Sequence, residues 1–371
     1  MSLLNPKPKV VVAMSGGVDS SVAAYLLKKQ GYEVLGVTFQ VYDYSRENRK
    51  EGKGGCCSIE DVDDARLVAD KLGIKHYLVD TRKEFRENVI NYFLSSYQKG
   101  ETPNPCVACN THIKFDELEY YRNLFGAELM ATGHYAKLRR TDNEDVFIER
   151  AEDTARDQSY FLMGVNPMHL QKLMFPCGEY SKDQIRELAI EAGLCVSRKK
   201  DSMEICFIPN NDYRSFLKDQ LGNYERQGEI VDERTHKILG NHSGIQDFTV
   251  GQRKGLGSFG LEAFYVTRID SLTNRVYVGD AQKVFSKGMK LEVSSFMRVE
   301  DFLGHPLKVK IRSKAPEVEV AIRSIDRHQG QAVAEFLEPQ RAVTPGQFAV
   351  FYQGNLVVGG GAITEAIAGI S

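Results

Sequence analysis

Two cysteines, Cys106 and Cys109, are the residues of this chain best suited to sulfur or metal chemistry. They lie where a proline-containing loop, Glu101 to Asn110, precedes a predicted helix from Asn110 to Leu124. A helix N-terminus lowers the pKa of a nearby thiol, and only the thiolate attacks sulfur or binds a soft metal well. Because two prolines are expected to expose this loop, a purely structural pair is the less favoured interpretation.

A third cysteine of interest, Cys206, lies between Ile205 and Phe207. Taken alone, this setting is typical of a buried apolar cysteine. The chain has seven cysteines: Cys56, Cys57, Cys106, Cys109, Cys177, Cys195 and Cys206. An odd count in a large chain argues against a structural disulfide framework, so reactive thiols or a metal site are the better interpretation for some of them.

Phosphate binding is the second chemistry that the sequence indicates. An apolar run of strand length begins at Val10 and ends in Ser15-Gly16-Gly17, and the hydroxyl pair Ser20-Ser21 then opens a helical pattern. A strand, a glycine-rich turn and a helix N-terminus together form an anion site, because backbone N–H groups and partial positive charge face the ligand. Glycine also lets the backbone approach a phosphate that a Cβ would keep away.

Two common phosphate-binding patterns are absent around these glycines. No lysine follows them as in G-x-x-x-x-G-K-[ST], and there is no G-x-G-x-x-G. Ser-Gly-Gly-Val-Asp-Ser at residues 15–20 instead resembles the PP-loop of ATP pyrophosphatases. That resemblance implies cleavage of ATP between its α and β phosphates and an adenylated intermediate. An ordinary strand-to-helix turn is the alternative, which six matched residues in this context disfavour.

The elements that must position these residues alternate between strand and helix. The first predicted strand begins at Val10, and three more span Glu33–Phe39, Lys75–Asp80 and Glu128–His134. The first of the later predicted helices runs from a capping box at Ser58 to Leu72, and the others span Arg82–Gln98, Asn110–Leu124, Asp157–Leu173 and Ser181–Ala192. A loop is predicted at Tyr42–Gly55. This alternation predicts an α/β fold with a doubly wound parallel sheet. Ligands bind beyond the carboxyl ends of such strands, so Gly16-Gly17, Phe39 and Gly133 should line one crevice.

The second half of the chain has a different texture. Beyond about Tyr213 the helical periodicity fades, and short alternating strands such as Arg275–Val278, Val318–Ile322 and Ala332–Phe336 follow one another. This pattern predicts a small β-rich central domain and a C-terminal β-barrel. The expected domain boundaries are 1–212, 213–282 and 283–371.

The overall charge does not indicate a nucleic-acid partner. Among 371 residues, 42% are hydrophobic and the formal net charge is −2, so only a local basic face is possible. One is predicted at Lys308, Lys310, Arg312 and Lys314, which share a face at strand spacing without an intervening carboxylate. Such a face would suit a phosphate backbone, although a solvated strand face is the ordinary interpretation.

No targeting or membrane signal is visible. No apolar run approaches the length of a membrane span. The segment Met1–Lys9 lacks the apolar core of a signal peptide. We therefore expect a cytoplasmic protein that does not bind a membrane.

Several further segments, taken together in order, resemble the bacterial tRNA-specific 2-thiouridylases, the MnmA family. They are Ser-Gly-Gly-Val-Asp-Ser-Ser, Gly-Cys-Cys-Ser, Thr-Pro-Asn-Pro-x-x-x-Cys-Asn, Ala-Thr-Gly-His-Tyr-Ala, Arg-Asp-Gln-Ser-Tyr-Phe-Leu and Gly-Gln-Arg-Lys-Gly-Leu-Gly, with Pro345-Gly346-Gln347 near the C-terminus. The resemblance covers nearly the whole chain. It implies a PP-loop domain, a small central β domain and a C-terminal β-barrel.

The same resemblance implies a reaction. ATP, with Mg²⁺, adenylates the C2 carbonyl oxygen of the wobble uridine of tRNA and releases pyrophosphate, because an adenylate is a better leaving group than a carbonyl oxygen. Sulfur then replaces AMP to give 2-thiouridine. Cys206 would carry the persulfide, and Cys109 would free its terminal sulfur and close a transient disulfide with Cys206. The persulfide donor would be a cysteine desulfurase or a sulfur relay protein, and the tRNAs those for Lys, Glu and Gln.

Ligand contacts are also implied by position. The ATP-binding set is Ala13, Met14, Ser15, Gly16, Gly17, Val18, Asp19, Ser20, Phe39 and Gly133, and Asp19 is a candidate for placing Mg²⁺ or phosphate. The tRNA-binding set is Asn104, Pro105, Cys106, His134, Arg156, Asp157, Gln158, Arg312, Ser313 and Gln347. For His134 and Asp157 the ordinary interpretations are a structural histidine and a helix cap.

Cys106 departs from one type of family member, in which the resemblance implies an aspartate with an acid–base role at this position. The thiol leaves that role open. Cys106, Cys109 and Cys206 are therefore also possible ligands of a [4Fe–4S] cluster whose open iron would bind sulfide. We prefer the persulfide route. The sequence is also compatible with a PP-loop adenylating ligase that needs no thiols, and with a non-catalytic RNA-binding protein that keeps a remnant nucleotide fold.

Overall fold

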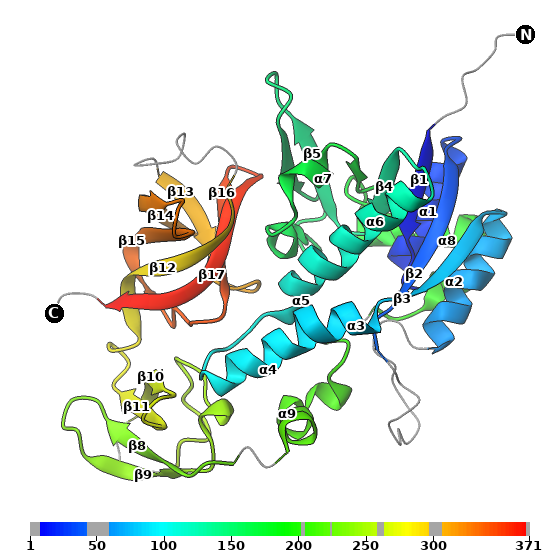
Figure 1. The fold of residues 1–371 in the computed structure, drawn as a ribbon. Coiled ribbons are helices and arrows are strands. Elements are labelled where there is room, and N and C mark those ends of the chain that lie inside the picture. Colours follow the sequence, from blue (N-terminus) through cyan, green and yellow to red (C-terminus); the bar gives the residue numbers. More distant parts are fainter. Residues whose placement is uncertain are drawn as a thin grey trace, which may run out of the picture. The chain divides into compact units, whose positions relative to one another are not determined.

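The computed structural model describes residues 8–42, 59–201, 205–222, 225–257, 263–296 and 306–368 (Figure 1). The Gly-Cys-Cys-Ser segment, the Ser58 cap and most of the predicted Tyr42–Gly55 loop lie outside these residues. The chain divides into two compact units. The first comprises Met1–Val89, Cys106–Asn211 and Asn355–Val357, and the second comprises Ile90–Pro105, Asp212–Gly354 and Val358–Ser371. None of the helices in the described ranges is both long and apolar enough to cross a membrane.

A five-stranded parallel sheet forms the centre of the first unit. Its strands are β1 (Lys9–Ala13), β2 (Glu33–Gln40), β3 (Lys75–Asp80), β4 (Leu129–Thr132) and β7 (Leu173–Met174), in the order β3-β2-β1-β4-β7. Ala13 at the end of β1 pairs with Val37 on one side and Thr132 on the other. The strand order reverses between β1 and β4, and ligands of open α/β sheets bind at such a switch point. The predicted doubly wound fold is confirmed.

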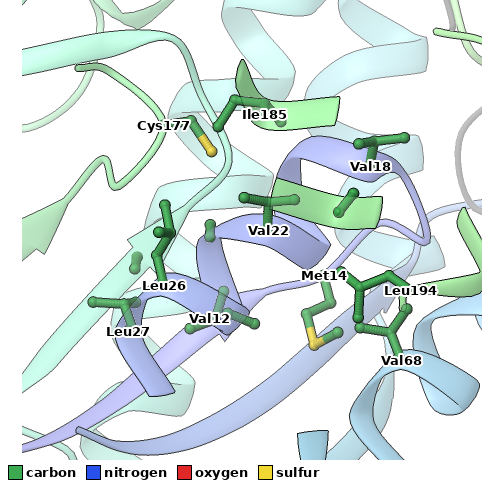
Figure 2. Packing of buried hydrophobic residues seen from close by; sticks show 14 of the residues in the cluster. Val12, Met14, Val18, Val22, Leu26, Leu27, Val68, Cys177, Ile185 and Leu194 are labelled. Carbon is green, nitrogen blue, oxygen red and sulfur yellow. The ribbon is translucent and has the colours of Figure 1, made fainter. Parts of the chain in front are cut away.

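Both faces of this sheet are covered, as a parallel sheet requires. Val10, Val12 and Met14 pack against α1 (Val18–Lys29), α2 (Ile59–Leu72) and α8 (Lys182–Glu191) through a cluster of buried residues. Figure 2 shows Val12 and Met14 facing Val22, Leu27 and Val68 in this cluster. Val11 is also fully buried, and strand alternation points it to the opposite face.

Two helical runs in the described chain contain a π-helical turn. The first consists of α3 (Arg82–Phe85), a π turn at Arg86–Ile90 and α4 (Asn91–Gln98), and the second of α5 (Pro105–Ala108), a π turn at Cys109–Phe115 and α6 (Asp116–Leu124). The prediction of a loop up to Asn110 is therefore wrong after Asn104. Proline is well suited to the first position of a helix, where its missing N–H costs nothing. Pro103 and Pro105 are themselves buried, whereas Cys106 directly after them is exposed.

The predicted helix at Asp157–Leu173 is also wrong. This stretch holds only a 3₁₀ turn at Ser159–Leu162 and the short helix α7 (Pro167–Leu170) before β7. The Asp157 carboxylate accepts hydrogen bonds from the Ala151 N–H (3.1 Å) and the Ser159 hydroxyl (2.7 Å), so it closes a local turn in place of a helix. An unpredicted hairpin, β5 (Ala136–Arg140) and β6 (Val146–Arg150), precedes it. A second 3₁₀ turn lies at Cys195–Arg198. The predicted Ser181 cap is confirmed as a capping box with Gln184.

The second unit contains two β structures. A helix that the sequence pattern did not predict, α9 (Tyr213–Leu221), is capped by Asp212, and a 3₁₀ turn lies at Ile245–Asp247.

The first β structure is a four-stranded sheet with the order β10 (Tyr265–Asp270), β11 (Arg275–Gly279), β8 (Gly228–Asp232), β9 (Ile238–His242). The barrel has the order β12 (Phe285–Phe296), β15 (Gln331–Arg341), β14 (Val318–Asp326), β13 (Pro306–Lys310), β16 (Phe348–Gln353), β17 (Leu356–Ala368), and the pairing of β12 with β17 closes it. The predicted barrel is confirmed, whereas the boundaries at 212 and 282 stay predictions.

The basic strand at Lys308–Lys314 is shorter than predicted. Strand β13 ends at Lys310, and Arg312 begins a turn in which its carbonyl accepts from the Ala315 N–H at 3.0 Å. Lys308 pairs across the sheet with Glu319. The four positive residues therefore do not form one uninterrupted strand face, because the chain turns after Lys310 and a carboxylate lies opposite Lys308.

Candidate active site

The glycine loop after β1 is shaped by its own side chains and by close packing. Gly16 has φ +70°, and a Cβ there would lie 2.0 Å from the Asp61 carbonyl oxygen of α2. The Ser15 N–H donates to Ser20 Oγ at 3.1 Å, and the Ser21 hydroxyl donates to the Gly17 carbonyl at 2.8 Å. The first N–H groups of α1 have no partner inside the helix and remain available to an anion.

The other predicted ATP contacts lie at the same edge of the sheet. Gly133 directly follows β4, and a Cβ there would lie 2.5 Å from the Ser20 nitrogen. Only glycine therefore lets the end of β4 approach the first turn of α1. Phe39, near the end of β2, is buried, with its ring 6.3 Å from that of Tyr121. Ser15 is exposed, whereas Met14 and Val18 are buried.

A carboxylate–lysine–carboxylate network adjoins the loop. Lys182 Nζ, on a side chain that is 8% exposed, lies 2.8 Å from Asp19 Oδ1 and 2.7 Å from Asp201 Oδ1. The Tyr135 hydroxyl donates to Asp19 Oδ1 at 2.7 Å. Burial and then the Asp19 charge raise the pKa of Tyr135, so this phenol stays a proton donor.

Two arginines complete the charge balance around Asp201. Arg186 lies 3.0 Å and Arg156 3.1 Å from its oxygens. Burial alone would raise the pKa of Asp201, but the hydrogen bond and charge of Lys182, with the two guanidinium groups, hold the pKa below its ordinary value. The network thus connects Asp19, a predicted ATP contact, with Arg156, a predicted tRNA contact. It does so through Lys182 and Asp201, and Asp201 precedes Cys206 in the sequence.

A second lysine closes the other side of the loop. Lys199 Nζ donates to the Gly16 carbonyl at 3.0 Å, to Asp61 Oδ1 at 2.6 Å and to Asp64 Oδ2 at 2.5 Å. Burial would lower the pKa of Lys199, but its bonds to the two carboxylates raise it above the ordinary value. Lys199 therefore stays charged and ties α2 to the loop.

The three candidate thiols all belong to the first unit. Cys106 is exposed in α5, Cys109 is half-buried at the start of a π turn, and Cys206 is half-buried in an irregular segment. Within the described ranges, which include these three cysteines, no group of three or more His, Cys, Asp or Glu residues is arranged to hold a metal ion. Ligation of a cluster by Cys106, Cys109 and Cys206 stays a prediction.

Cys177 is a different kind of cysteine. It is fully buried beside α1, and its thiol donates to the Asp19 carbonyl at 3.3 Å (Figure 2). Burial raises its pKa, so this thiol is a core residue and not a nucleophile.

Three predicted tRNA contacts in the first unit have internal partners. His134 is 8% exposed, its Nδ1 lies 2.8 Å from Thr132 Oγ1, and its ring stacks on Phe115. Burial and then the Lys114 charge place the pKa of His134 well below 6.5, so the imidazole is neutral. Gln158 Oε1 accepts from the Tyr135 N–H at 2.9 Å, and the Asp157 side chain is 4% exposed. These contacts give all three residues a structural role, and contact with tRNA stays a prediction for each of them.

The remaining predicted tRNA contacts belong to the second unit, apart from exposed Arg156 and Cys106. Arg312 is exposed and Ser313 is half-buried in the turn after β13. Gln347 Nε2 donates to the Thr102 carbonyl at 2.8 Å, and the Thr102 N–H donates to the Pro345 carbonyl at 2.9 Å. The Gln347 amide group therefore anchors the segment that contains Asn104 and Pro105.

Sequence reasoning missed Lys182, Asp201, Lys199 and Asp61 as members of the site. One signal was available for Lys182. It follows the Ser181 cap at the first position of α8, where the helix dipole disfavours a positive charge. A lysine there indicates a carboxylate partner from elsewhere in the chain.

A glycine loop and a helix N-terminus at the switch point of a doubly wound sheet, followed by a β-barrel, define a nucleotide-binding protein of the PP-loop class. Residues 8–210 match the family described as tRNA methyl transferase HUP domain, residues 214–280 its PRC-barrel domain, and residues 287–363 the aminomethyltransferase beta-barrel domain.

Curated relatives specify the family within this class. A tRNA-specific 2-thiouridylase MnmA of Clostridium perfringens is 46% identical over 97% of this chain and 99% of its own length. Those of Thermoanaerobacter pseudethanolicus and Lachnoclostridium phytofermentans are 44% and 45% identical over 97% and 96% of this chain, and over 98% and 99% of their own lengths. The chain belongs to the MnmA family of tRNA-specific 2-thiouridylases.

Proposed function

We propose that this protein is an ATP-dependent tRNA 2-thiouridylase that acts on the wobble uridine through an adenylated intermediate. Near full-length similarity to proteins of that name carries the proposal. The glycine loop supports the ATP-dependent half, because it presents helix N–H groups at the switch point of the sheet.

In the adenylation step, the uridine C2 oxygen attacks the α-phosphorus of ATP and pyrophosphate leaves. Negative charge on the leaving group would meet the N–H groups at residues 16–20. Lys182 and Arg186 place positive charge beside Asp19 and Asp201, which keeps the two carboxylates from repelling the triphosphate. Phe39 and Gly133 belong to the same site in this proposal.

Mg²⁺ fits this arrangement as an ion bound mainly to ATP. Mg²⁺ retains several waters and takes only one or two protein carboxylates beside substrate phosphates. Asp19 is the candidate carboxylate: its side chain is 32% exposed. Both of its oxygens accept from Lys182, and Oδ1 also accepts from Tyr135, so the ion would share this carboxylate with the lysine. When bound, the ion would neutralise phosphate charge.

The sulfur step needs two thiols. A persulfide on Cys206, supplied by a donor protein such as a cysteine desulfurase or a sulfur relay protein, is attacked at its inner sulfur by the Cys109 thiolate. The products are a Cys109–Cys206 disulfide and hydrosulfide, which replaces AMP at C2. The disulfide is then reduced by two electrons from an external thiol reductant. The exposure of Cys106 and the partial exposure of Cys109 and Cys206 support access of these partners.

Binding of tRNA is proposed for the Asn104–Cys106 segment, Arg156 and the Arg312–Ser313 turn. Exposed Arg156 and Arg312 carry charge suited to phosphates. The target base must leave its stack to reach the reacting groups, as other modified bases do. The proposed substrates are the tRNAs for Lys, Glu and Gln.

The function is tested by incubating unmodified transcripts of these tRNAs with enzyme, ATP, Mg²⁺ and a persulfide-generating desulfurase. Mass spectrometry of ribonuclease fragments should show 2-thiouridine at the wobble position of the anticodon loop, and only when ATP is present. Thiolation of a different base, or a tRNA left unchanged while ATP is cleaved, would contradict the proposal.

A further inference from the structure

The helical turn that begins at Cys109 is not α-helical. Residues Cys109–Phe115 form a π turn between α5 and α6, whose labels in Figure 1 mark the two ends of this run. π turns are rare, and those inside longer helices are frequently found at functional sites, because they insert a residue and rotate the side chains on either side. The direction of the Cys109 side chain therefore depends on what holds this turn open.

Asn110, the next residue, has a buried amide with an unusual balance of hydrogen bonds. Its exposure is 3%, and its Nδ2 donates to the Phe161 carbonyl at 3.0 Å. Its Oδ1 is buried and has no hydrogen-bond partner among the described residues. An unsatisfied buried acceptor destabilises the folded state, so an asparagine is unfavourable at residue 110 if its side chain only fills space. Such a group in a native protein marks strain or function.

The partner carbonyl is itself held in place. The Ser159 hydroxyl and N–H both donate to the buried Asp157 carboxylate, and the Phe161 N–H donates to the Gln158 carbonyl at 2.9 Å. These bonds fix the 3₁₀ turn at Ser159–Leu162 and so aim the Phe161 carbonyl.

Close packing supports the same turn from a neighbouring position. A Cβ at Gly164 would lie 2.4 Å from Thr111 Oγ1, and that hydroxyl donates to the Val107 carbonyl at 3.0 Å. Only glycine at residue 164 allows Thr111 this position. The π turn is therefore held at two successive residues, Asn110 and Thr111, directly after the thiol.

We propose that Asn110 is a positioning residue for Cys109. Its amide ties the π turn to the Phe161 carbonyl and so fixes the direction in which the Cys109 thiolate approaches the persulfide. The inference rests on the proposed function, because it assumes that Cys109 is the attacking thiol. It also gives the buried Asp157 an internal role, since Asp157 sets the turn that receives the Asn110 amide.

The test is the substitution Asn110→Asp, which keeps the shape but removes the donor and places a carboxylate against the Phe161 carbonyl. Single-turnover thiolation by persulfide-loaded enzyme should fall by about 10- to 100-fold, as expected for a misplaced reacting group. Pyrophosphate release with tRNA should stay within about twofold of the parent, because no phosphate contact changes. The pH dependence of Cys109 alkylation by iodoacetamide, followed by peptide mass spectrometry, should also shift.

The matched control is Asn88→Asp. Asn88 also lies in a π turn and donates through Nδ2 to a backbone carbonyl, that of Glu84, at 3.0 Å, but it is exposed. This variant should retain thiolation and the alkylation profile. If Asn110→Asp does not fold, Gly164→Ala replaces it, because this variant perturbs the turn without introducing a buried charge. Thiolation should then fall in Gly164→Ala while pyrophosphate release is retained.

Two outcomes would overturn the positioning role. One is normal thiolation in both Asn110→Asp and Gly164→Ala. The other is a parallel loss of thiolation and pyrophosphate release with an unchanged alkylation profile, which a purely structural role would give. Cys109→Ser separates the proposed sulfur route from the positioning role of Asn110. If Cys109→Ser retains thiolation, the proposed sulfur route is wrong. If Cys109→Ser is inactive but Asn110→Asp is active, only the positioning role is wrong.

Discussion

The glycine loop and the thiol region of the first unit differ in how completely the folded chain builds them. The loop is fixed by hydrogen bonds among Ser15, Ser20 and Gly17, by Lys199 at the Gly16 carbonyl and by close contact with Gly133. The thiols lie in exposed or half-buried positions on the short helix α5, a π turn and an irregular segment. In the proposed reaction, the fold therefore preorganises the site of the ATP step, whereas the thiols of the sulfur step lie at more accessible positions.

Cys206→Ser should give the largest effect and should act on the sulfur half alone. Without the thiol there is no persulfide, so thiolation with the desulfurase should fall below detection, while tRNA-dependent pyrophosphate release continues. Both products are measured in the same reaction. The matched control is Cys195→Ser, at an exposed cysteine outside the proposed sulfur route, which should change neither product. Surviving 2-thiouridine formation in Cys206→Ser would show that the sulfur takes another route.

Lys182→Met should give the next largest effect and should act on the ATP half. It leaves Asp19 and Asp201 without the ammonium group that bridges them. Breaking a buried pair costs about 3–5 kcal/mol, and solvent reaches Asp19, so we expect a loss of about 2–3 kcal/mol in the free energy of unfolding. Pyrophosphate release should fall together with thiolation. Urea denaturation measures the stability and the pyrophosphate assay the activity. The control is Lys172→Met, which removes an exposed lysine from an ion pair with Glu119.

Gly133→Ala should damage the loop through packing alone. The new Cβ would lie 2.5 Å from the Ser20 nitrogen, whereas at Gly17 it would meet Ser15 Oγ at an ordinary 3.4 Å. Overpacking of this kind costs about 1–3 kcal/mol. Gly133→Ala should therefore weaken ATP binding, measured by calorimetry, more than Gly17→Ala does. Equal losses in the two variants would mean that backbone approach at Gly133 is not what shapes the site.

His134 should make stability depend on pH near neutrality. Its pKa in the folded protein lies well below 6.5, so the unfolded chain binds a proton that the folded chain does not. The free energy of unfolding should therefore fall as the pH drops below about 6.5, by at most about 1.4 kcal/mol per pH unit, and stay flat above it. His134→Gln should reduce this slope in urea titrations at several pH values, and exposed His328→Gln should not.

Cys106→Asp should give the smallest effect. It introduces the aspartate that the resemblance to one type of family member implies at this position, on an exposed side chain. Thiolation should stay within a few-fold of the parent, which would make Cys106 an acid–base equivalent. Complete loss of thiolation in this variant would instead give the Cys106 thiol an essential role of its own.

The difference between the two regions also explains what the sequence could and could not predict. Local chemistry predicts the glycine loop, because strand, turn and helix start are consecutive between Val10 and Ser21. The partners of Asp19 lie far along the chain, at Tyr135 and Lys182, and only the fold brings them together. A helix was wrongly predicted at Asp157 because aspartate is typical of a helix cap. In the structure the buried Asp157 carboxylate accepts the Ala151 N–H and closes a turn instead.

One measurement tests the central claim that the two regions act in sequence on one substrate. Pyrophosphate and 2-thiouridine are quantified in the same reaction of enzyme, unmodified tRNA, ATP and persulfide-loaded desulfurase. We predict that both require tRNA and appear in equal amounts in the parent enzyme, and that Cys206→Ser yields pyrophosphate without 2-thiouridine. Formation of 2-thiouridine without pyrophosphate, or in Cys206→Ser, would contradict the account.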